Sequence, residues 1–397
     1  MAKLIDITGK AIAGEWGTDD DNGTGIPVLR TTNFTNEGIV DFSNVVTRTI
    51  TKRNIAEKYL RHGDIIIEKS GGSDKQPVGR VIFFEGPEQK YLFNNFTGLL
   101  RVRDSSKWLP RYIFYTLFAR YRSGGTRAFE NRTTGLHNLQ TDAYVNSVDV
   151  ADKALNQQHL ICDVLDRINQ IIAERRQQLS ALDNLIKARF VELFGDMLVN
   201  PLNWKQTRLD GVSNIVSGIT KGRKPKSEEL FEVPYMAVSN VKDGYIDWTT
   251  VKTIPATRTE IEQYRLLPFD VLMTEGGDPD KLGRGAIIHE PPANCIHQNH
   301  IFRVRLNQEC LLPVFFAQYL QQQRAKRYFL GCAKQTTGIA SINMKQLSAL
   351  PVLSPPIELQ RQYAAFVAQI DKSKFSIMAS FPLLKRLPVY QRQEWTI

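Results

Sequence analysis

Residues 26–33 of the chain, Ile26-Pro27-Val28-Leu29-Arg30-Thr31-Thr32-Asn33, return 207 residues later as Val233-Pro234-Tyr235-Met236-Ala237-Val238-Ser239-Asn240. The match continues downstream, because Asp64-Ile65-Ile66-Ile67 reappears as Asp270-Val271-Leu272-Met273. A repeat of this length indicates a duplicated domain, since solenoid repeats are only about 20–50 residues long. The chain is therefore expected to contain two similar modules.

Further matches extend the repeat over most of each module. Gly71-Gly72 corresponds to Gly276-Gly277, and Arg101-Val102-Arg103 is aligned with Arg303-Val304-Arg305. The segment Thr133-Thr134-Gly135 corresponds to Thr336-Thr337-Gly338. The small drift in spacing indicates short insertions and deletions in loops.

The composition favours a polyanionic partner. Among 397 residues, 51 Lys and Arg outnumber 41 Asp and Glu, which gives a net charge of +10. The four cysteines are scattered without a CxxC pair, so the sequence predicts neither a disulfide framework nor a four-thiolate zinc site. No secretion signal and no apolar run of about 18 residues is present, so we expect a cytoplasmic protein that does not enter a membrane.

A long helix is predicted between the modules, from Leu155 to Phe194, where neither Gly nor Pro occurs. Two interleaved series at spacing seven run along it and are typical of a coiled-coil seam. They are Leu165, Ile172, Leu179, Ile186 and Leu193, and Ile161, Ile168, Arg175, Leu182 and Arg189. The seam requires a partner helix.

The partner helix is predicted after the second module, where Ile357 to Ile370 aligns with Leu155 to Ile168. The two helices are expected to pair antiparallel. Phe381-Pro382 is predicted to end the second helix early, and the tail beyond it has no seam pattern.

The sequence predicts an α+β fold for each module. Short β-branched and aromatic runs, such as residues 64–68, 81–84 and 285–288, alternate with Gly, Pro, Asn and Asp. Helices are expected near Pro110–Tyr121 and Pro313–Tyr328. The predicted fold is two similar mixed α/β domains separated by a pair of long antiparallel coiled-coil helices.

Catalytic and metal-binding motifs are not recognisable in the sequence. There is no glycine-rich phosphate or cofactor loop, which methyltransferases and ATPases need. The segment Cys295 to His300, with His289 nearby, resembles a metal site weakly, but the first module has Leu92-Phe93-Asn94-Asn95 in its place. We expect no metal and no catalytic residue here, and satisfied polar histidines instead.

The candidate DNA-binding residues lie in loops that recur in both modules. Glycines let backbone amides approach phosphate, while Arg, Lys, Asn and Gln can bind base edges. The candidates in the first module are Arg30, Thr31, Thr32, Asn33, Lys69, Ser70, Gly71, Lys75, Arg132, Thr133, Thr134, His137 and Asn138, and those in the second are Lys221, Arg223, Lys224, Ser239, Asn240, Lys281, Arg284, Thr336, Thr337, Ser341 and Asn343. The alternative, that single members only build turns and helix caps, stays open.

The order module, long helix, module, shorter helix resembles the specificity subunit of type I restriction-modification systems. The residues that carry the resemblance are the Thr-Thr-Gly segments at 133–135 and 336–338, the run Leu350 to Gln360, and the helix end Lys187 to Asp196. The resemblance implies two DNA target-recognition domains, at residues 1–150 and 197–353. It implies coiled-coil helices at 151–196 and 354–380, followed by a divergent tail at 381–397.

The resemblance also implies the partners. They are double-stranded DNA with a split target, two methyltransferase (modification) subunits, and restriction and translocase subunits reached through the complex. Type I enzymes use S-adenosylmethionine and ATP, but this chain is expected to bind no cofactor, because catalysis would belong to the partner subunits. Two other functions remain open: a detached recognition part of a single-chain restriction-methylation enzyme, and a basic scaffold without sequence specificity.

Overall fold

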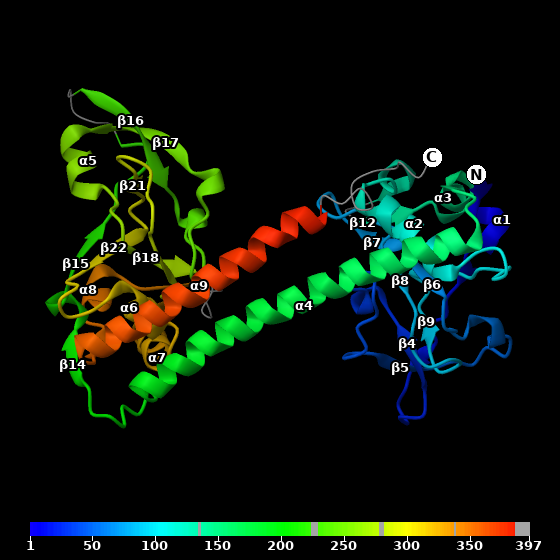
Figure 1. Cartoon of the computed structure of the whole chain (residues 1–397), viewed down its shortest axis with the longest axis horizontal. Helices are drawn as coiled ribbons and strands as arrows, with labels where there is room; N and C mark the ends of the chain where they lie inside the picture. Colours follow the sequence, from blue (N-terminus) through cyan, green and yellow to red (C-terminus); the bar gives the residue numbers. More distant parts are fainter. Residues whose placement is uncertain (134–135, 224–228, 278–281, 337–338, 386–397) are drawn as a thin grey trace. The chain divides into compact units, whose positions relative to one another are not determined.

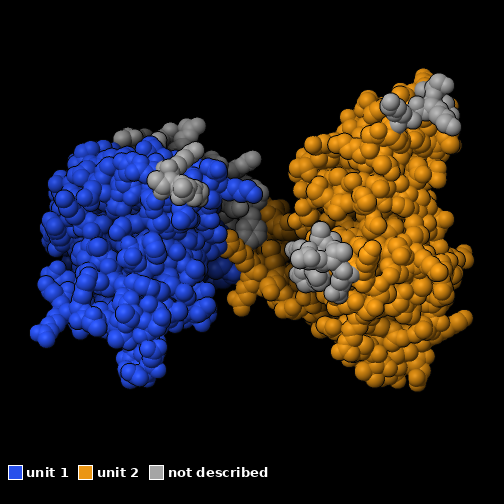
Figure 2. Space-filling model, turned by 180° about the vertical axis from the view of Figure 1, so that it is seen from behind, with its two compact units in different colours: residues 1–174, 380–397 blue, residues 175–379 orange. Residues whose placement is uncertain are grey.

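The computed structural model describes residues 1–133, 136–223, 229–277, 282–336 and 339–385 (Figure 1). The chain divides into two compact units (Figure 2), which consist of residues 1–174 with 380–397 and of residues 175–379. The 40-residue helix α4, Leu155–Phe194, contributes its first half to unit 1 and its second half to unit 2. This confirms the long helix predicted from the sequence.

Unit 1 holds four small sheets, in the strand orders β2-β10-β6-β8, β3-β5-β4-β9, β11-β12-β7 and β1-β13. Its helices are α1 (Leu4–Thr8), α2 (Pro110–Arg122) and α3 (Thr141–Ser147). Its strands are β1 (Ala2–Lys3), β2 (Ile12–Ala13), β3 (Thr18–Asp19), β4 (Ile26–Leu29), β5 (Val46–Thr49), β6 (Ile65–Glu68), β7 (Ser70–Gly72), β8 (Val81–Phe83), β9 (Leu92–Phe93), β10 (Thr97–Leu100), β11 (Glu130–Thr133), β12 (Leu136–Leu139) and β13 (Asp149–Val150).

Unit 2 repeats this plan, with the sheets β15-β22-β18-β20, β17-β16-β21, β19-β24-β23 and β14-β25. Its helices are α5 (Arg258–Tyr264), α6 (Pro313–Leu320), α7 (Gln323–Cys332), α8 (Met344–Ser348) and α9 (Ile357–Lys385). Its strands are β14 (Lys205–Arg208), β15 (Ser213–Ser217), β16 (Leu230–Met236), β17 (Lys252–Thr257), β18 (Val271–Thr274), β19 (Gly276–Gly277), β20 (Gly285–Ile287), β21 (Ile296–His297), β22 (Ile301–Leu306), β23 (Lys334–Thr336), β24 (Ile339–Ser341) and β25 (Pro351–Ser354).

The central sheet of each unit is β2-β10-β6-β8 in unit 1 and β15-β22-β18-β20 in unit 2. An ion pair with a buried aspartate fixes the register of this sheet in each unit. Arg101 binds both carboxylate oxygens of Asp64 at 2.7 Å, and Arg305 binds both oxygens of Asp270 at 2.8 Å. Arg101 therefore corresponds to Arg305, and the sequence alignment of Arg101 with Arg303 was wrong by two residues. Arg alternates with Val in both segments, Arg101-Val102-Arg103 and Arg303-Val304-Arg305. A shift of two residues, one period of a strand, therefore aligns Arg with Arg again.

A β-bulge explains part of the drift in spacing between the modules. In unit 1, Ser70 pairs with Asn138 and Gly72 pairs with His137, so Gly71 is an extra residue. In unit 2, Gly276 and Gly277 pair with Ser341 and Ala340 without a bulge. Gly71 has a φ of +134°, a conformation that side chains with a Cβ rarely adopt.

Within unit 2, α4 and α9 pair antiparallel. Lys374 of α9 binds Asp183 of α4 at 2.7 Å, whereas the later α4 residue Phe190 contacts the earlier α9 residue Tyr363, at 5.4 Å between ring centroids. All ten residues of the two predicted α4 series are buried or half-buried. The antiparallel pairing predicted from the sequence is confirmed for this stretch, whereas Ile161 and Leu165 of the predicted series pack on the core of unit 1.

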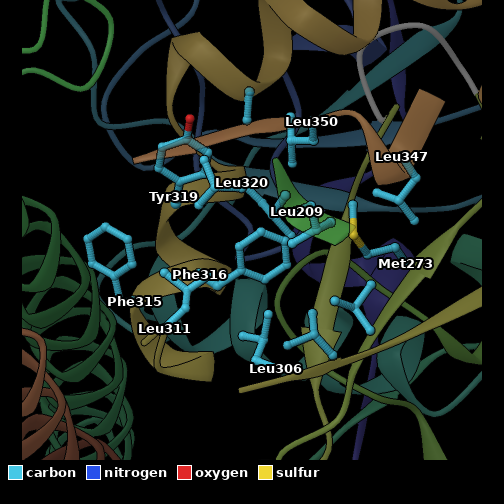
Figure 3. Close-up of a cluster of buried hydrophobic side chains, with 14 of the residues drawn as sticks. Leu209, Met273, Leu306, Leu311, Phe315, Phe316, Tyr319, Leu320, Leu347 and Leu350 are labelled. Atoms are coloured by element: carbon cyan, nitrogen blue, oxygen red, sulfur yellow. The ribbon is translucent and has the colours of Figure 1, made fainter. Parts of the chain in front are cut away.

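The end of α4 is anchored in the hydrophobic core of unit 2. Phe190 and Phe194 are completely buried and pack on Phe315 of α6 and on Tyr363. Figure 3 shows the neighbouring core, in which Leu209, Met273, Leu306 and Leu350 come from widely separated parts of the unit. Four aromatic rings that bury this much apolar surface stabilise the junction by several kcal/mol, at about 25 cal/mol per Å².

A buried glutamine attaches each module to its helix in the same way. Gln158, in the first turn of α4, accepts a hydrogen bond from Leu109 N at 2.8 Å and donates to the carbonyls of Lys107 and Lys153, both at 2.9 Å. Gln360, in the first turn of α9, accepts from Leu312 N at 2.9 Å and donates to the carbonyls of Cys310 and Pro355. Both side chains are fully buried.

Two helix predictions need correction. The helix expected near Pro313–Tyr328 is two helices, α6 and α7, because the chain leaves helical geometry at Gln322, which is extended at the start of α7. The helix expected to end at Phe381-Pro382 continues to Lys385. Pro382 lies in the last turn of α9 and does not end the helix there.

We call the buried contacts of Gln158 and Gln360 the glutamine clamp. It can be tested by the substitution Gln360→Leu, which keeps a side chain of similar size. The change leaves one N–H and two carbonyl groups of a buried site unpaired, so we expect the free energy of unfolding to fall by about 2–4 kcal/mol. Chemical denaturation measures the loss. Gln362→Leu, at an exposed position of the same helix, is the control and should change stability by less than about 0.5 kcal/mol. Equal effects of the two changes would contradict the clamp.

Candidate nucleic-acid interface

The candidate residues of unit 1 lie on two structures that meet. Thr31 to Asn33 form a short 3-10 turn directly after β4, and Lys69 to Gly71 lie on or beside β7. Arg80 connects them, because its guanidinium donates to the carbonyls of Thr31 and Phe34, each at 2.9 Å, and lies 3.4 Å from Glu68. Burial raises the pKa of the Glu68 carboxyl, although the charge of Arg80 opposes this shift.

The third group of candidates joins the same sheet. Strand β12 carries His137 and Asn138 and pairs with β7, so Asn138 lies opposite Ser70. In unit 2 the same arrangement places Ser341 of β24 opposite Gly276 and Lys334. Thr336 lies at the end of β23, and Arg132 and Thr133 lie on β11. Thr134, Lys224, Lys281 and Thr337 lie outside the described residues.

Asn33 and Asn240, two of the predicted DNA-binding residues, hold turns together through hydrogen bonds within the protein. The Asn33 side-chain oxygen accepts from Arg30 N at 2.9 Å, and its NH2 group donates to the carbonyls of Asp41 and Asn44. Asn240 makes the equivalent bonds to Ala237 N, Asp247 O and Thr250 Oγ1. Both amides are buried and fully engaged, so they hold the turn instead of facing a ligand.

Four other candidates are also engaged within the protein. His137 is buried, and its Nδ1 lies 2.9 Å from the buried Glu130 carboxylate. Arg223 forms an ion pair with Glu260, which holds the pKa of that carboxyl below its ordinary value. Asn343 caps helix α8 by accepting a hydrogen bond from Gln346 N at 2.9 Å. The carbonyl of Arg284 accepts from Thr274 N at 3.3 Å, so its backbone belongs to the central sheet.

Several candidates remain accessible. Thr32 and Ser239 occupy the same place in the two equivalent turns, and both are exposed. Lys75 and Lys221 are exposed, while Arg30, Thr31, Lys69 and Ser70 are half-buried. The accessible set is thus polar or basic, and Arg30, Thr31, Thr32 and Ser239 lie in or beside the turns that the buried asparagines hold in place. Such a surface suits phosphate and base-edge contacts.

Comparisons with known proteins agree with this duplicated design. The family model described as type I restriction modification DNA specificity domain matches residues 201–382. The EcoKI specificity subunit of Escherichia coli is 21% identical over 366 residues, which cover 87% of this chain and 75% of that protein. A Methanocaldococcus jannaschii protein named for the MjaX specificity subunit is 25% identical over 173 residues, which are 43% of this chain and 40% of that protein.

Solved structures show the same fold. A chain from a type I restriction-modification system, studied for complex assembly and conformational transition, has a TM-score of 0.55 and 15% identity, covering 97% of this chain and 94% of its own length. The S subunit from M. genitalium has a TM-score of 0.52 and 15% identity, with 97% and 92% covered. Residues 201–382 therefore match a type I restriction modification DNA specificity domain, and the whole chain has the fold of type I specificity subunits. Its function is accordingly the recognition of DNA sequence.

The two histidines of the segment Cys295 to His300 have separate partners. His297 is completely buried, with Nδ1 3.0 Å from Tyr264 O and Nε2 3.3 Å from Val216 O. His300 pairs instead with Glu275. Burial raises the pKa of the Cys295 thiol to about 12. In the described part of the chain, no group of three or more His, Cys, Asp or Glu residues is placed to hold a metal ion.

Among the described residues, no helix is both long enough and apolar enough to cross a membrane. The four cysteines are free thiols.

The first prediction from this site concerns Asn240. Asn240→Ala removes the buried amide and leaves Ala237 N and Asp247 O unpaired, so we expect a loss of about 2–3 kcal/mol in the free energy of unfolding. The folded fraction should keep the base preference of the parent protein, as measured by binding selection at reduced temperature. The control Ser239→Ala, at the exposed neighbour, should keep full stability. A changed base preference in folded Asn240→Ala protein would restore Asn240 as a reader.

The second prediction concerns pH. Burial lowers the pKa of His297 to about 4, whereas an unfolded histidine has a pKa of about 6.5. The unfolded state therefore binds the proton first as the pH falls. Above about pH 6.5, His297 is neutral in both states and leaves the free energy of unfolding unchanged. Between about pH 6.5 and pH 4, that free energy falls progressively, by roughly 3 kcal/mol in total.

The comparison variant is His297→Phe, because Phe93 occupies the equivalent place in unit 1. Unfolding free energies measured from pH 7 to pH 4 should fall less steeply for this variant than for the parent protein. Parallel pH profiles of the two proteins would show that His297 does not titrate in this range.

Proposed function

We propose that this specificity subunit reads a split double-stranded DNA target, with residues 1–150 reading one half and residues 197–353 reading the other. The observation that carries the proposal is the duplication itself. The sheets, the Asp–Arg pair, the asparagine turn and the glutamine clamp all recur, whereas exposed residues on the same turns differ. A repeated scaffold with changed surface residues suits two readers of different sequences.

The continuous helix α4 supports a fixed distance between the two half-sites. Its 40 residues at about 1.5 Å each give roughly 60 Å, more than the ~34–36 Å of one DNA turn. In this proposal, the segments 151–196 and 354–380, which contain α4 and most of α9, set the length of the unread gap.

The long helices also support docking of partner subunits. Leu160 of α4 and Phe375 of α9 expose 65% and 75% of their surface, which is high for large apolar side chains on helices. We assign these helix faces to the two modification subunits, through which restriction and translocase subunits join the complex. Methyl transfer, cleavage and ATP use then belong to those partners, and this chain acts without a cofactor of its own.

The test is a binding selection from random double-stranded DNA, performed with the full chain in complex with its modification subunits. We expect two fixed blocks of sequence separated by a gap of constant length. A single continuous block would contradict the split target. Binding that unrelated DNA competes away equally well would instead identify a scaffold without specificity.

The capture of separate modification subunits distinguishes this function from the detached part of a single-chain restriction-methylation enzyme. A specificity subunit should retain them through size-exclusion chromatography. Failure to bind any separate modification subunit would favour the single-chain alternative.

A quantitative prediction concerns Lys221, which is exposed beside the ion-paired Arg223. If Lys221 contacts phosphate, Lys221→Ala should weaken binding to all sequences alike and reduce the slope of log K against log salt by about one unit. Lys372→Ala, at an exposed position on α9, is the control for a general change of charge. An unchanged slope in Lys221→Ala would return this loop to ordinary surface.

A further inference from the structure

The two units hold one accessible backbone position in the same way. Lys69 N donates to Phe96 O at 2.8 Å, and Leu139 N donates to Lys69 O at 2.8 Å. In unit 2, Glu275 N donates to His300 O at 3.0 Å, and Ile342 N donates to Glu275 O at 2.8 Å. Lys69 and Glu275 are therefore equivalent, and so are Phe96 and His300.

The side chains at this shared position have opposite chemistry. In unit 1, half-buried Lys69 directs its ammonium group to Asn95 O at 3.4 Å, and the neighbouring Phe96 exposes 53% of its surface. In unit 2, His300 Nδ1 lies 2.5 Å from Glu275 Oε2, and about a third of the Glu275 side chain is exposed. A cation beside an exposed aromatic ring has thus been replaced by a carboxylate beside an imidazole.

The position lies at the centre of the candidate interface. It directly precedes β7 in unit 1 and β19 in unit 2. It also directly follows Glu68, the last residue of β6, or Thr274, the last residue of β18. Through Glu68 and Arg80 it is also connected to the turn that carries Thr31 and Thr32. The two backbone hydrogen bonds that hold this position are the same in both units, whereas the side chains differ, so the side chains here can distinguish the two readers.

A carboxylate at this place is informative because DNA phosphates repel it. Near the DNA backbone Glu275 would weaken binding, whereas at a base edge it can accept a hydrogen bond from the amino group of cytosine. Lysine at the same place can donate to O6 and N7 of guanine, and an exposed aromatic side chain can contact the methyl group of thymine.

We propose that one base-reading position occurs in both readers. It consists of Lys69 with Phe96 in unit 1 and of Glu275 with His300 in unit 2. Glu275 accepts from a cytosine amino group in one half-site, and Lys69 donates to a guanine in the other. His300 is a positioning residue, since its imidazole holds the Glu275 carboxylate. This inference rests on the proposed reading of a split target and adds the residues and the base class at one position of each half.

The experiment is a binding selection on half-sites, with the full chain in complex with its modification subunits. The parent protein first defines the two half-sites, and Glu275→Gln is then compared with it. We expect one position of a single half-site to lose its cytosine preference by about ten- to a hundred-fold, while the other half-site stays unchanged. The matched control is Glu262→Gln, an exposed acid of unit 2 outside this position, which should change nothing.

Exchange variants separate a reading role from a structural one. The double variant Glu275→Lys with His300→Phe places the unit 1 pair in unit 2 and should convert that position from cytosine to guanine. His300→Phe alone should broaden the preference at the same position and leave thermal stability unchanged, because both side chains are accessible.

The outcomes distinguish this inference from the function on which it rests. If the parent protein selects a split site and Glu275→Gln keeps all base preferences, the inference is wrong and the proposed function stands. If the parent protein selects no split site, the proposed function fails, and this inference fails with it. Loss of preference in both half-sites together would likewise overturn the assignment of Glu275 to a single reader.

Discussion

A buried glutamine in the first turn of each long helix is the contact on which the rest of the structure depends. Gln158 and Gln360 bind the backbone just before α2 and α6, so each module has a fixed orientation on the helix that follows it. An unpaired polar group in such a buried place costs about 1–3 kcal/mol, which makes any other orientation unfavourable. With α4 also anchored at its end by Phe190 and Phe194, a single helix is part of both cores.

Within each module, the same buried interactions recur, whereas the exposed residues differ. The Asp64–Arg101 and Asp270–Arg305 pairs keep the central sheets in register, and Asn33 and Asn240 hold the turns beside them. Because buried polar contacts maintain the fold, exposed residues such as Thr32 and Ser239 can change without a loss of stability. In the proposed function, this separation lets one fold serve two readers of different sequences.

Much of this was visible in the sequence because duplication and seven-residue spacing are one-dimensional patterns. The seam of α4 and the antiparallel partner helix could be predicted for that reason. The role of Asn33 could not, since asparagine serves turns and base edges equally well, and only its three internal bonds decide between them. The alignment of Arg101 with Arg305 likewise required the partner Asp64, which is distant in sequence. The segments that begin at Lys69 and at Glu275 match in sequence but differ in length by one residue, and backbone hydrogen bonds show that Lys69 and Glu275 are equivalent.

In the proposed function, the long helices set the distance between the two half-sites, and a paired insertion changes that distance. Seven residues added to α4 within Leu165–Leu193 and to α9 within Tyr363–Ile377 keep the seam in phase and lengthen the pair by about 10 Å. Binding selection on half-sites with randomised gaps, using the assembled complex, should then show a gap longer by about three base pairs at ~3.4 Å each, with both half-site sequences unchanged. An unchanged gap in a variant that still folds and assembles would show that the helices do not set the distance.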